Sequence, residues 1–318
     1  MLRLTQSAPR HNGFLALSSI AIMTTFLCSA PAIGQEAATP DELIDVNYVI
    51  ESDGADRILL AGKLRTLTQQ VAAASCSVTS GIDVVEAHDV LEQATAEFDR
   101  YIAALRDGDE ELHILGPEED ARIVRDLEHV LEEWSAIHSA IDAVIADSNN
   151  VDAAHVIDDH NLELLDLTTI LSSDISGRYA HPYEMTAADA MMIEIAGRQL
   201  MLTQKMAKDS CEIWTGYHSE EAKEDLVATM AVFETSLNAL RYGMPDAGLQ
   251  AAPNDVIRTD LDLLLSRWDI VKINQQRLVD GEELNEEQKT EIFHDLLVEL
   301  ADLEHLLDDY KEHAERAH

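Results

Sequence analysis

Apolar residues recur at helical spacing along most of the chain. One stretch shows the pattern well, with apolar side chains at Leu127, Val130, Leu131, Trp134, Ile137 and Ile141. Spacings of three and four residues place such side chains on one face of an α-helix. No stretch sustains the strict alternation of apolar and polar residues that predicts a half-buried strand. We therefore expect an all-α protein.

Turn-forming residues divide this pattern into four helical segments in each half of the chain. In the first half the breaks fall at residues 79–81, 107–117 and 147–150. In the second half they fall at residues 215–216, 243–254 and 280–285. Four amphipathic helices joined by short connections predict a four-helix bundle. The pattern therefore predicts two bundles in tandem.

The two halves are copies of one unit. A shift of 135 positions places Tyr48 on Tyr183, Ala61-Gly62 on Ala196-Gly197, Leu67-Thr68-Gln69 on Leu202-Thr203-Gln204, Ser75-Cys76 on Ser210-Cys211 and Phe98 on Phe233. Matches that keep one register over such a length indicate an internal duplication. We place the first unit at residues 35–182 and the second at residues 183–318, after a leader at residues 1–34.

The first helix of each unit has two faces to bury. An ordinary core stripe runs along this helix in the first unit, at Leu60, Leu64, Leu67, Val71, Ala74 and Val78. Nearly opposite, at the alternating spacing of a helix–helix seam, lie Gly62, Arg65, Gln69, Ala72 and Cys76. No Asp or Glu occurs from Arg57 to Ile82. An acidic protein would place such residues on a solvated face, so the second face is expected to be an interface.

Two interpretations of this second face remain open. The helix is either buried on both sides within its own bundle, or the two first helices pack on each other about a pseudo-twofold axis. In the second case, equivalent residues near the axis would face one another.

The chain is long enough for one large or two modest domains, and it is strongly acidic. It contains 61 acidic and 22 basic residues among 318, for a formal net charge of −39. Such a charge repels nucleic acid and anionic lipid surfaces, so neither is expected as a direct partner. The acidity is otherwise explained by solubility and identifies no ligand.

The first 34 residues have the form of a secretory signal peptide. Arg3 and Arg10 precede an apolar run from Phe14 to Leu27, and no acid occurs before Glu36. The alternative is an uncleaved anchor, although the run is short for a membrane-spanning helix of about 20 residues. We expect cleavage and a periplasmic protein.

Removal of this leader leaves two cysteines, Cys76 and Cys211. An even count in an exported protein is compatible with one disulfide. The two residues are equivalent in the repeat, so they would meet if the first helices pack about a pseudo-twofold axis. The alternative is two separate buried thiols.

Basic residues lie within the stretches that lack acids, with Lys63 and Arg65 in the first unit and Arg198 and Lys205 in the second. An Arg beside the exposed backbone of a Gly, in a groove shielded from water, can hold a small oxyanion by charge-assisted hydrogen bonds. The alternative is that these side chains extend to the acidic surface and form ordinary ion pairs.

Two segments resemble the AGRQRMLTQKMAK-type signature of a known family. They are residues 61–69, AGKLRTLTQ, and residues 196–208, AGRQLMLTQKMAK. The family is the type IV pili methyl-accepting chemotaxis transducer N-terminal domain, also called the PilJ-type or NarX-like sensor domain. The resemblance implies a periplasmic four-helix bundle, usually placed between two membrane helices of a histidine kinase or chemoreceptor. For the nitrate and nitrite sensors of this group it implies that the corresponding helix lies at a dimer interface, where its Arg holds the anion.

Two departures from the family pattern change this expectation. The Arg three residues after the Gly is Arg65 in the first copy but Leu200 in the second, so a symmetric clamp of two Arg residues is not expected. Flanking membrane helices and a kinase or methyl-accepting segment are also not recognisable, so we do not expect the chain to signal across a membrane by itself. A tandem copy would supply within one chain the helix pairing that receptors obtain by dimerising.

No pattern predicts catalysis, a metal site or a cofactor. A di-metal bundle needs paired Glu-x-x-His elements, and Glu110 to His113 lies in a loop without a counterpart in the second unit. His155 and His160 are five positions apart and do not share a helix face well. A c-type haem would need Cys-x-x-Cys-His, which the sequence lacks.

We therefore expect a non-catalytic periplasmic sensor-type or ligand-binding protein. Its expected ligand is a small oxyanion such as nitrate or nitrite, held between the two first helices by Gly62, Lys63, Arg65, Gln69, Gly197, Arg198 and Gln204. The alternative function is a ligand-free interaction module that docks on a membrane chemoreceptor, a histidine kinase or a pilus-associated partner.

Overall fold

The computed structural model describes residues 53–180 and 186–316 of the chain. Within these ranges the fold is all-α, with eight α-helices, two single-turn 3-10 helices and no β-strand. The all-α prediction is therefore confirmed, whereas the expected signal peptide at residues 1–34 lies outside the described residues. No helix in the described ranges combines the length and apolar character needed to cross a membrane.

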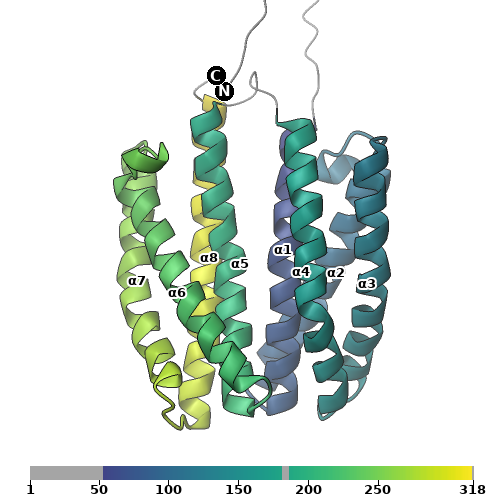
Figure 1. The fold of residues 1–318 in the computed structure, drawn as a ribbon, viewed down its shortest axis with the longest axis vertical. Helices are drawn as coiled ribbons and strands as arrows, with labels where there is room; N and C mark the ends of the chain where they lie inside the picture. Colours follow the sequence, from purple (N-terminus) through teal and green to yellow (C-terminus); the bar gives the residue numbers. More distant parts are fainter. Residues whose placement is uncertain (1–52, 181–185, 317–318) are drawn as a thin grey trace, which may run out of the picture. The chain divides into compact units, whose positions relative to one another are not determined.

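The helices run alternately up and down in two sets of four (Figure 1). The first set is α1 (Gly54–Ser80), α2 (Val84–Asp107), α3 (Ala121–Ala146) and α4 (Val151–Tyr179). The second set is α5 (Ala187–Thr215), α6 (Ser219–Tyr242), α7 (Asp255–Val279) and α8 (Glu286–Arg316). Each set packs as one bundle, as the periodicity predicts.

Short polar residues begin several of these helices, because their side chains accept hydrogen bonds from backbone N–H groups of the first turn. The Asp120 carboxylate accepts from the backbone of Arg122 and Ile123 at the start of α3. Asn150 and Asn254 cap α4 and α7 in the same way. These local signals lie where the sequence pattern places the breaks.

The duplication is visible in one unusual turn. Gly108 and Gly243 end α2 and α6 with φ values of +90° and +80°, and a Cβ would lie 3.0 Å from the Gly116 backbone in the first case and 2.9 Å from the Ala251 nitrogen in the second. Only Gly avoids both the strained φ and the clash. Each Gly leads into a single 3-10 turn, η2 (Glu110–Leu112) or η3 (Pro245–Ala247).

Each bundle has its own apolar core, with an aromatic pair at equivalent positions. In the first core the rings of Phe98 and Trp134 stack with centroids 3.9 Å apart. In the second core Phe233 and Trp268 lie 4.7 Å apart. Aromatic pairs contribute stabilisation beyond their buried area. Both copies of the repeat therefore share this stabilising contact as well as the sequence.

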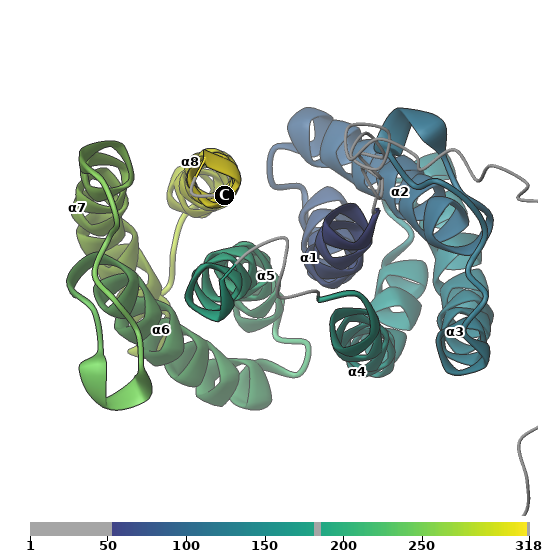
Figure 2. The same cartoon turned by 90° about the horizontal axis from the view of Figure 1, so that it is seen from above.

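The first helices of the two bundles pack against each other, with α1 beside α5. Figure 2 shows this pair at the centre and α4 and α8 on opposite sides of it. Side chains cross the boundary, since Ala73 of α1 belongs to the second core and Phe293 of α8 belongs to the first. The second face of α1 is thus an interface between bundles, and the interpretation in which its own bundle alone buries α1 is wrong.

A disulfide joins Cys76 of α1 to Cys211 of α5, with the two Cα atoms 6.1 Å apart. Because these residues occupy equivalent positions near the ends of parallel helices, the bond lies close to the pseudo-twofold axis. It ties one bundle to the other, and neither bundle is cross-linked within itself by it.

A buried polar network in the first bundle holds the loop between α2 and α3. The Arg57 guanidinium donates to the Gly116 carbonyl at 2.5 Å and lies 3.4 Å from the Glu118 carboxylate. The Tyr179 hydroxyl donates to the same carboxylate at 2.9 Å. Met192 occupies the equivalent of Arg57 in the second copy, so this network belongs to the first bundle alone.

Tyr179→Phe is expected to lower the free energy of unfolding by about 2 kcal/mol, since it removes a hydrogen bond to a buried carboxylate. Urea denaturation followed by circular dichroism measures the change. Tyr242→Phe is the matched control, because the Tyr242 side chain is 63% exposed. An equal change in the free energy of unfolding of the two variants would show that the hydrogen bond from Tyr179 to Glu118 does not stabilise the fold.

Candidate functional site

Arg65 is a predicted anion-site residue whose side chain reaches the opposite bundle. Its side chain is 10% exposed, and its Nη2 atom lies 3.3 Å from Oε1 of Glu194 on α5. The Nε atom is buried and has no hydrogen-bond partner among the described residues. Gly62 lies one turn away, where a Cβ would be 3.8 Å from Nη2. These two residues lie together, as the sequence predicts.

The other predicted cations and the second Gly do not join Arg65. The Lys63 ammonium lies 5.8 Å from the centroid of the Tyr101 ring on α2, and its charge also acts on Glu304 of α8. Gly197 faces Leu307 of α8, and Arg198 is exposed. The helical wheel gives the correct helix for each residue, but the neighbouring helices decide which way the side chain extends.

The two predicted glutamines are buried and differ in their partners. Gln69 donates from Nε2 to Oδ1 of Asn161 on α4 at 2.8 Å, so it links α1 to its own bundle. Its Oε1 atom and the Nε2 atom of Gln204 have no hydrogen-bond partner in the described part of the chain. Buried polar atoms ordinarily have one, so these amides retain unused hydrogen-bonding capacity beside the interface.

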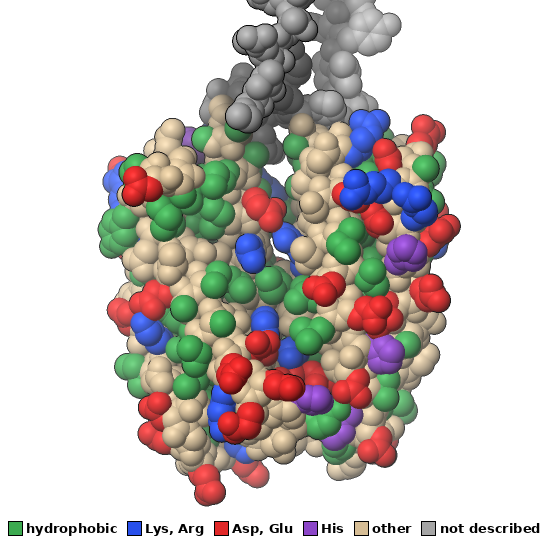
Figure 3. Space-filling model, viewed as in Figure 1, with side chains coloured by type: hydrophobic (Ala, Val, Ile, Leu, Met, Phe, Trp, Pro, Cys, Tyr) green, Lys and Arg blue, Asp and Glu red, His purple; other side chains and the backbone are tan. Residues whose placement is uncertain are grey.

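In Figure 3 a hollow separates the upper parts of the two bundles, and basic side chains lie in it. Lower on the same boundary, acidic, basic and histidine side chains gather between the bundles. This lower region contains a second site that is not among those predicted from the sequence.

The second site is a cavity of about 350 Å³ beside the disulfide. Its walls come from both bundles and include Cys76 of α1, His155 and Asp158 of α4, Lys208 and Glu212 of α5, and Lys289 of α8. Trp214 and Tyr217 also line it, and the Tyr217 ring stacks on His155 with centroids 3.6 Å apart. A cavity at a domain boundary with aromatic walls and a few charged groups has the usual character of a ligand pocket.

The charges beside this cavity form one network, in which Asp225 is exposed and the other groups are largely buried. Lys208 lies 3.6 Å from the Asp158 carboxylate, 3.4 Å from that of Asp209, and in direct contact with that of Glu212. Lys205 pairs with Asp209 at 3.2 Å and with Asp225 at 2.7 Å. Two ammonium groups thus face four carboxylates, so the network has an excess of negative charge when all of them are ionised.

This excess changes the protonation of the network. Burial, together with the hydrogen bond and negative charge of Asp158, raises the pKa of Glu212 to about 9, although Lys208 opposes the shift. Burial alone would lower the pKa of Lys208, but the carboxylates of Asp209, Glu212 and Asp158 more than offset it and raise that pKa. Lys208 is therefore charged at neutral pH, and burial favours the protonated form of Glu212.

A signal for this site exists in the repeat. Lys208, Asp209 and Glu212 fall on Ala73, Ala74 and Ser77 of the first copy, so one copy places charges where the other has small residues. A buried helix tolerates such charges only when partners are present. Asp158 gives no such signal, because pairs of acidic residues such as Asp158-Asp159 are common in this chain.

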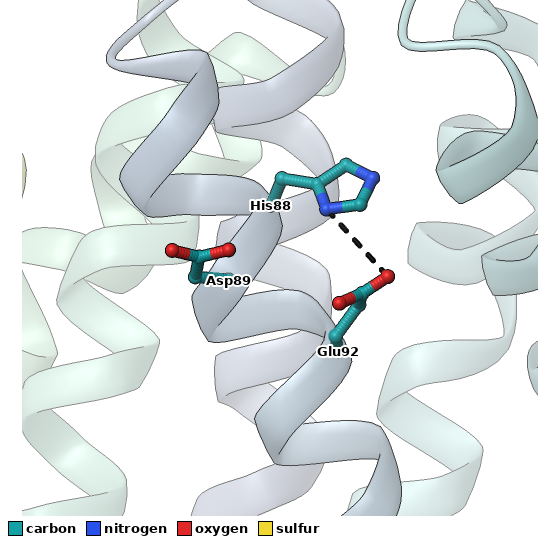
Figure 4. A group of neighbouring side chains, drawn as sticks. All are labelled: His88, Asp89 and Glu92. Carbon is teal, nitrogen blue, oxygen red and sulfur yellow. Dashed lines mark ion pairs between the residues drawn. The ribbon is translucent and has the colours of Figure 1, made fainter.

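Three groups of His and carboxylate side chains also lie close together in the described residues. Figure 4 shows one of them on α2, where His88 and Glu92 are directed toward each other, 3.8 Å apart, with Asp89 beside them. Such groups are common on acidic surfaces, so we assign no metal site to them.

Comparison with known proteins bears on the whole chain. The family model described as "Type IV pili methyl-accepting chemotaxis transducer N-term", PilJ, matches residues 51–160 and again residues 184–315. No curated protein matches the sequence. The two matches cover more than half of the chain and correspond to the two bundles, and the description is that of a sensory or interaction domain of a chemotaxis transducer. The chain therefore belongs to the PilJ family of transducer N-terminal domains and contains two tandem copies of that domain.

Proposed function

We propose that this chain is a non-catalytic, exported sensor-type protein of the periplasm that binds a small oxyanion such as nitrate or nitrite at Arg65. The proposal rests on the burial and the incomplete hydrogen bonding of the Arg65 guanidinium. The guanidinium is buried against α5, its Nε atom lacks a partner among the described residues, and its other edge faces a single carboxylate.

Glu194 shows what chemistry the Arg65 position accepts. A carboxylate and a nitrate ion are both planar and negatively charged, and both fit the forked donors of a guanidinium. The Glu194 side chain is 51% exposed, so it can turn into solvent at little cost, since such ion pairs contribute about 0–1 kcal/mol. An oxyanion from solution would compete with Glu194 for the same donors.

The proposed site is asymmetric. Leu200 occupies the position equivalent to Arg65 and is buried. Helix α5 therefore contributes no second guanidinium to the proposed site. It contributes apolar surface and the Glu194 carboxylate that competes with the oxyanion. The proposal therefore assigns the charge to the first copy. Among the residues predicted from the sequence, Gly62 lies beside Arg65, while Gln69 and Gln204 are buried amides that each have one atom without a hydrogen-bond partner among the described residues.

Glu194→Gln is expected to bind nitrate and nitrite about tenfold more tightly than the parent chain, because the competing negative charge is gone. Arg65→Ala is expected to abolish binding. Isothermal titration calorimetry with sodium nitrate and sodium nitrite, at constant ionic strength and with chloride as the reference anion, measures both effects.

Arg241→Ala is the matched control, since Arg241 also pairs with one carboxylate, that of Asp262, on the surface of the second bundle. It should leave oxyanion binding unchanged. Nitrate binding that persists in Arg65→Ala, or that is absent even in Glu194→Gln, would remove the basis of the anion site.

An interaction module is the second candidate function, and one observation favours it. Val256, Leu263 and Ile270 form a row on α7, seven residues apart, with exposed fractions of 59, 51 and 60%. Exposed apolar side chains at heptad spacing fit docking against another helix. In this case a photoreactive residue in place of Leu263 should crosslink to a membrane chemoreceptor or histidine kinase in intact cells. Crosslinking to neither would count against docking through α7.

A further inference from the structure

The cavity beside the Cys76–Cys211 disulfide is distinct from the Arg65 site. Arg65 and Cys76 are eleven residues apart on α1, which corresponds to about 16 Å along a helix. The cavity has its own walls, contributed by α1, α4, α5 and α8. It therefore has to be judged by its own chemistry, independently of the oxyanion proposal.

Two acidic side chains that line the cavity are suited to a cation. Asp158 and Glu212 line it, with side chains that are 16% and 6% exposed, and they belong to the network in which two lysines face four carboxylates. A proton on Glu212 relieves part of that negative charge in the absence of other cations. An ammonium group in the cavity would do the same, and it would replace the hydrogen bond between Asp158 and Glu212 with hydrogen bonds to both carboxylates.

One basic side chain that lines the cavity is suited to an anion. Lys289 of α8 lines the cavity, and its ammonium lies 5.8 Å from the centroid of the Trp214 ring. It forms no ion pair with any described residue, whereas Lys208 on the same cavity contacts three carboxylates. Lys289 is thus the cation of this site that still lacks a negative partner.

The other residues that line the cavity are partly apolar. The stacked rings of His155 and Tyr217 and the side chain of Trp214 lie along the cavity. The lining residues of α1 are Ala72, Cys76, Thr79 and Ser80, which carry no charge. A molecule with one positive and one negative group and a small apolar part would match all three kinds of wall.

We propose that this cavity binds a small zwitterion of the α-amino acid class, with the ammonium group between Asp158 and Glu212 and the carboxylate at Lys289. A simple amine would leave Lys289 unpaired and a simple carboxylate would add to the negative charge near Glu212. The volume of about 350 Å³ lies in the range of small-molecule pockets.

The protonation of Glu212 gives the proposal a distinctive signature. The ligand ammonium replaces the proton that Glu212 holds at neutral pH, so binding releases a proton. The groups that face Glu212 are Asp158 of α4 and Lys208 of its own helix, and His155, Tyr217 and Lys289 complete the titratable walls. Affinity should therefore rise between pH 6 and pH 8, by up to about tenfold per pH unit.

The test uses the full chain and each of the common L-amino acids as separate probes. A thermal-shift screen identifies the probes that bind, and calorimetry in two buffers with different ionisation enthalpies measures affinity and proton release. At least one amino acid is expected to bind, and its affinity is expected to fall about tenfold or more in Glu212→Gln and in Lys289→Ala. The Glu212→Gln variant should also lose the proton release.

Lys272→Ala is the matched control, because Lys272 lies on α7 and pairs with Glu234, away from the cavity lining. Arg65→Ala separates the two proposals, since it should abolish oxyanion binding and leave amino acid binding unchanged. The proposal is overturned if no amino acid binds, if binding is the same in Glu212→Gln or Lys289→Ala, or if ethanolamine binds as tightly as the amino acids do.

Discussion

The double variant Cys76→Ser/Cys211→Ser is expected to lose about 5 kcal/mol of unfolding free energy relative to the oxidised parent chain. The bond closes a loop between residues that are 135 positions apart. A loop of that length restricts the unfolded chain strongly, and the chain-entropy estimate for it is about 5 kcal/mol. Guanidinium denaturation followed by far-ultraviolet circular dichroism measures the loss.

The form of the transition should change as well. Each bundle has a separate core, and the disulfide joins the two bundles. The double variant is therefore expected to retain its helices under native conditions and to unfold in two steps, whereas the oxidised chain unfolds in one. The parent chain in reductant should behave like the variant, which controls for the serine side chains. Equal midpoints for the oxidised parent and the variant would contradict the prediction.

Glu299→Gln is expected to make the protein more stable above pH 8 and less sensitive to pH below it. Glu299 of α8 is 0% exposed, and neither carboxylate oxygen has a hydrogen-bond partner among the described residues. Burial raises the pKa of Glu299 from 4.5 to about 8, with Arg267 opposing the shift and Asp302 and Asp295 adding to it. Glutamine has the shape of the protonated acid and stays neutral at every pH.

The direction in which stability changes with pH follows from proton binding. Between about pH 4.5 and 8 the folded protein holds a proton on Glu299 that the unfolded chain releases. Stability therefore falls as pH rises through this window, by at most about 1.4 kcal/mol per unit and up to about 5 kcal/mol in total. Urea denaturation between pH 5 and pH 9 measures the slope for the parent and the variant.

Glu212 contributes a slope of the same sign, since its pKa is also raised. The slope should therefore decrease in Glu299→Gln without vanishing, and the difference between the two chains isolates Glu299. Glu287→Gln is the control, because Glu287 is exposed on the same helix. A parent and a Glu299→Gln variant with parallel stability curves would show that Glu299 is ionised in the folded state.

The sequence predicts the fold well because its signals are local and repeated. Helical spacing, capping residues such as Asn150 and the Gly108–Gly243 pair specify each helix and turn without reference to distant residues. The interface between α1 and α5 was also predictable, since an acidic protein leaves Asp and Glu out of a face only when that face is buried. Register in the repeat then places Cys76 opposite Cys211.

The candidate sites were less predictable, because they depend on a third helix. A helical wheel of α1 places Gln69 and Arg65 on one face. In the structure Gln69 bonds to Asn161 of α4, whereas Arg65 bonds to Glu194 of α5. The cavity needs Asp158 of α4 beside Lys208 of α5 and Lys289 of α8. Those residues come from both copies, and only the packed structure brings them together.

The disulfide also closes a ring in the chain. The polypeptide runs from α4 to α5, and the Cys76–Cys211 bond joins α1 to α5 near the ends of these two helices. Two separate chains pair to an extent set by their concentration, whereas partners within one covalent ring remain together at any dilution. The pairing of the two PilJ domains, and any site between them, should therefore be the same in a single isolated molecule as in a concentrated solution.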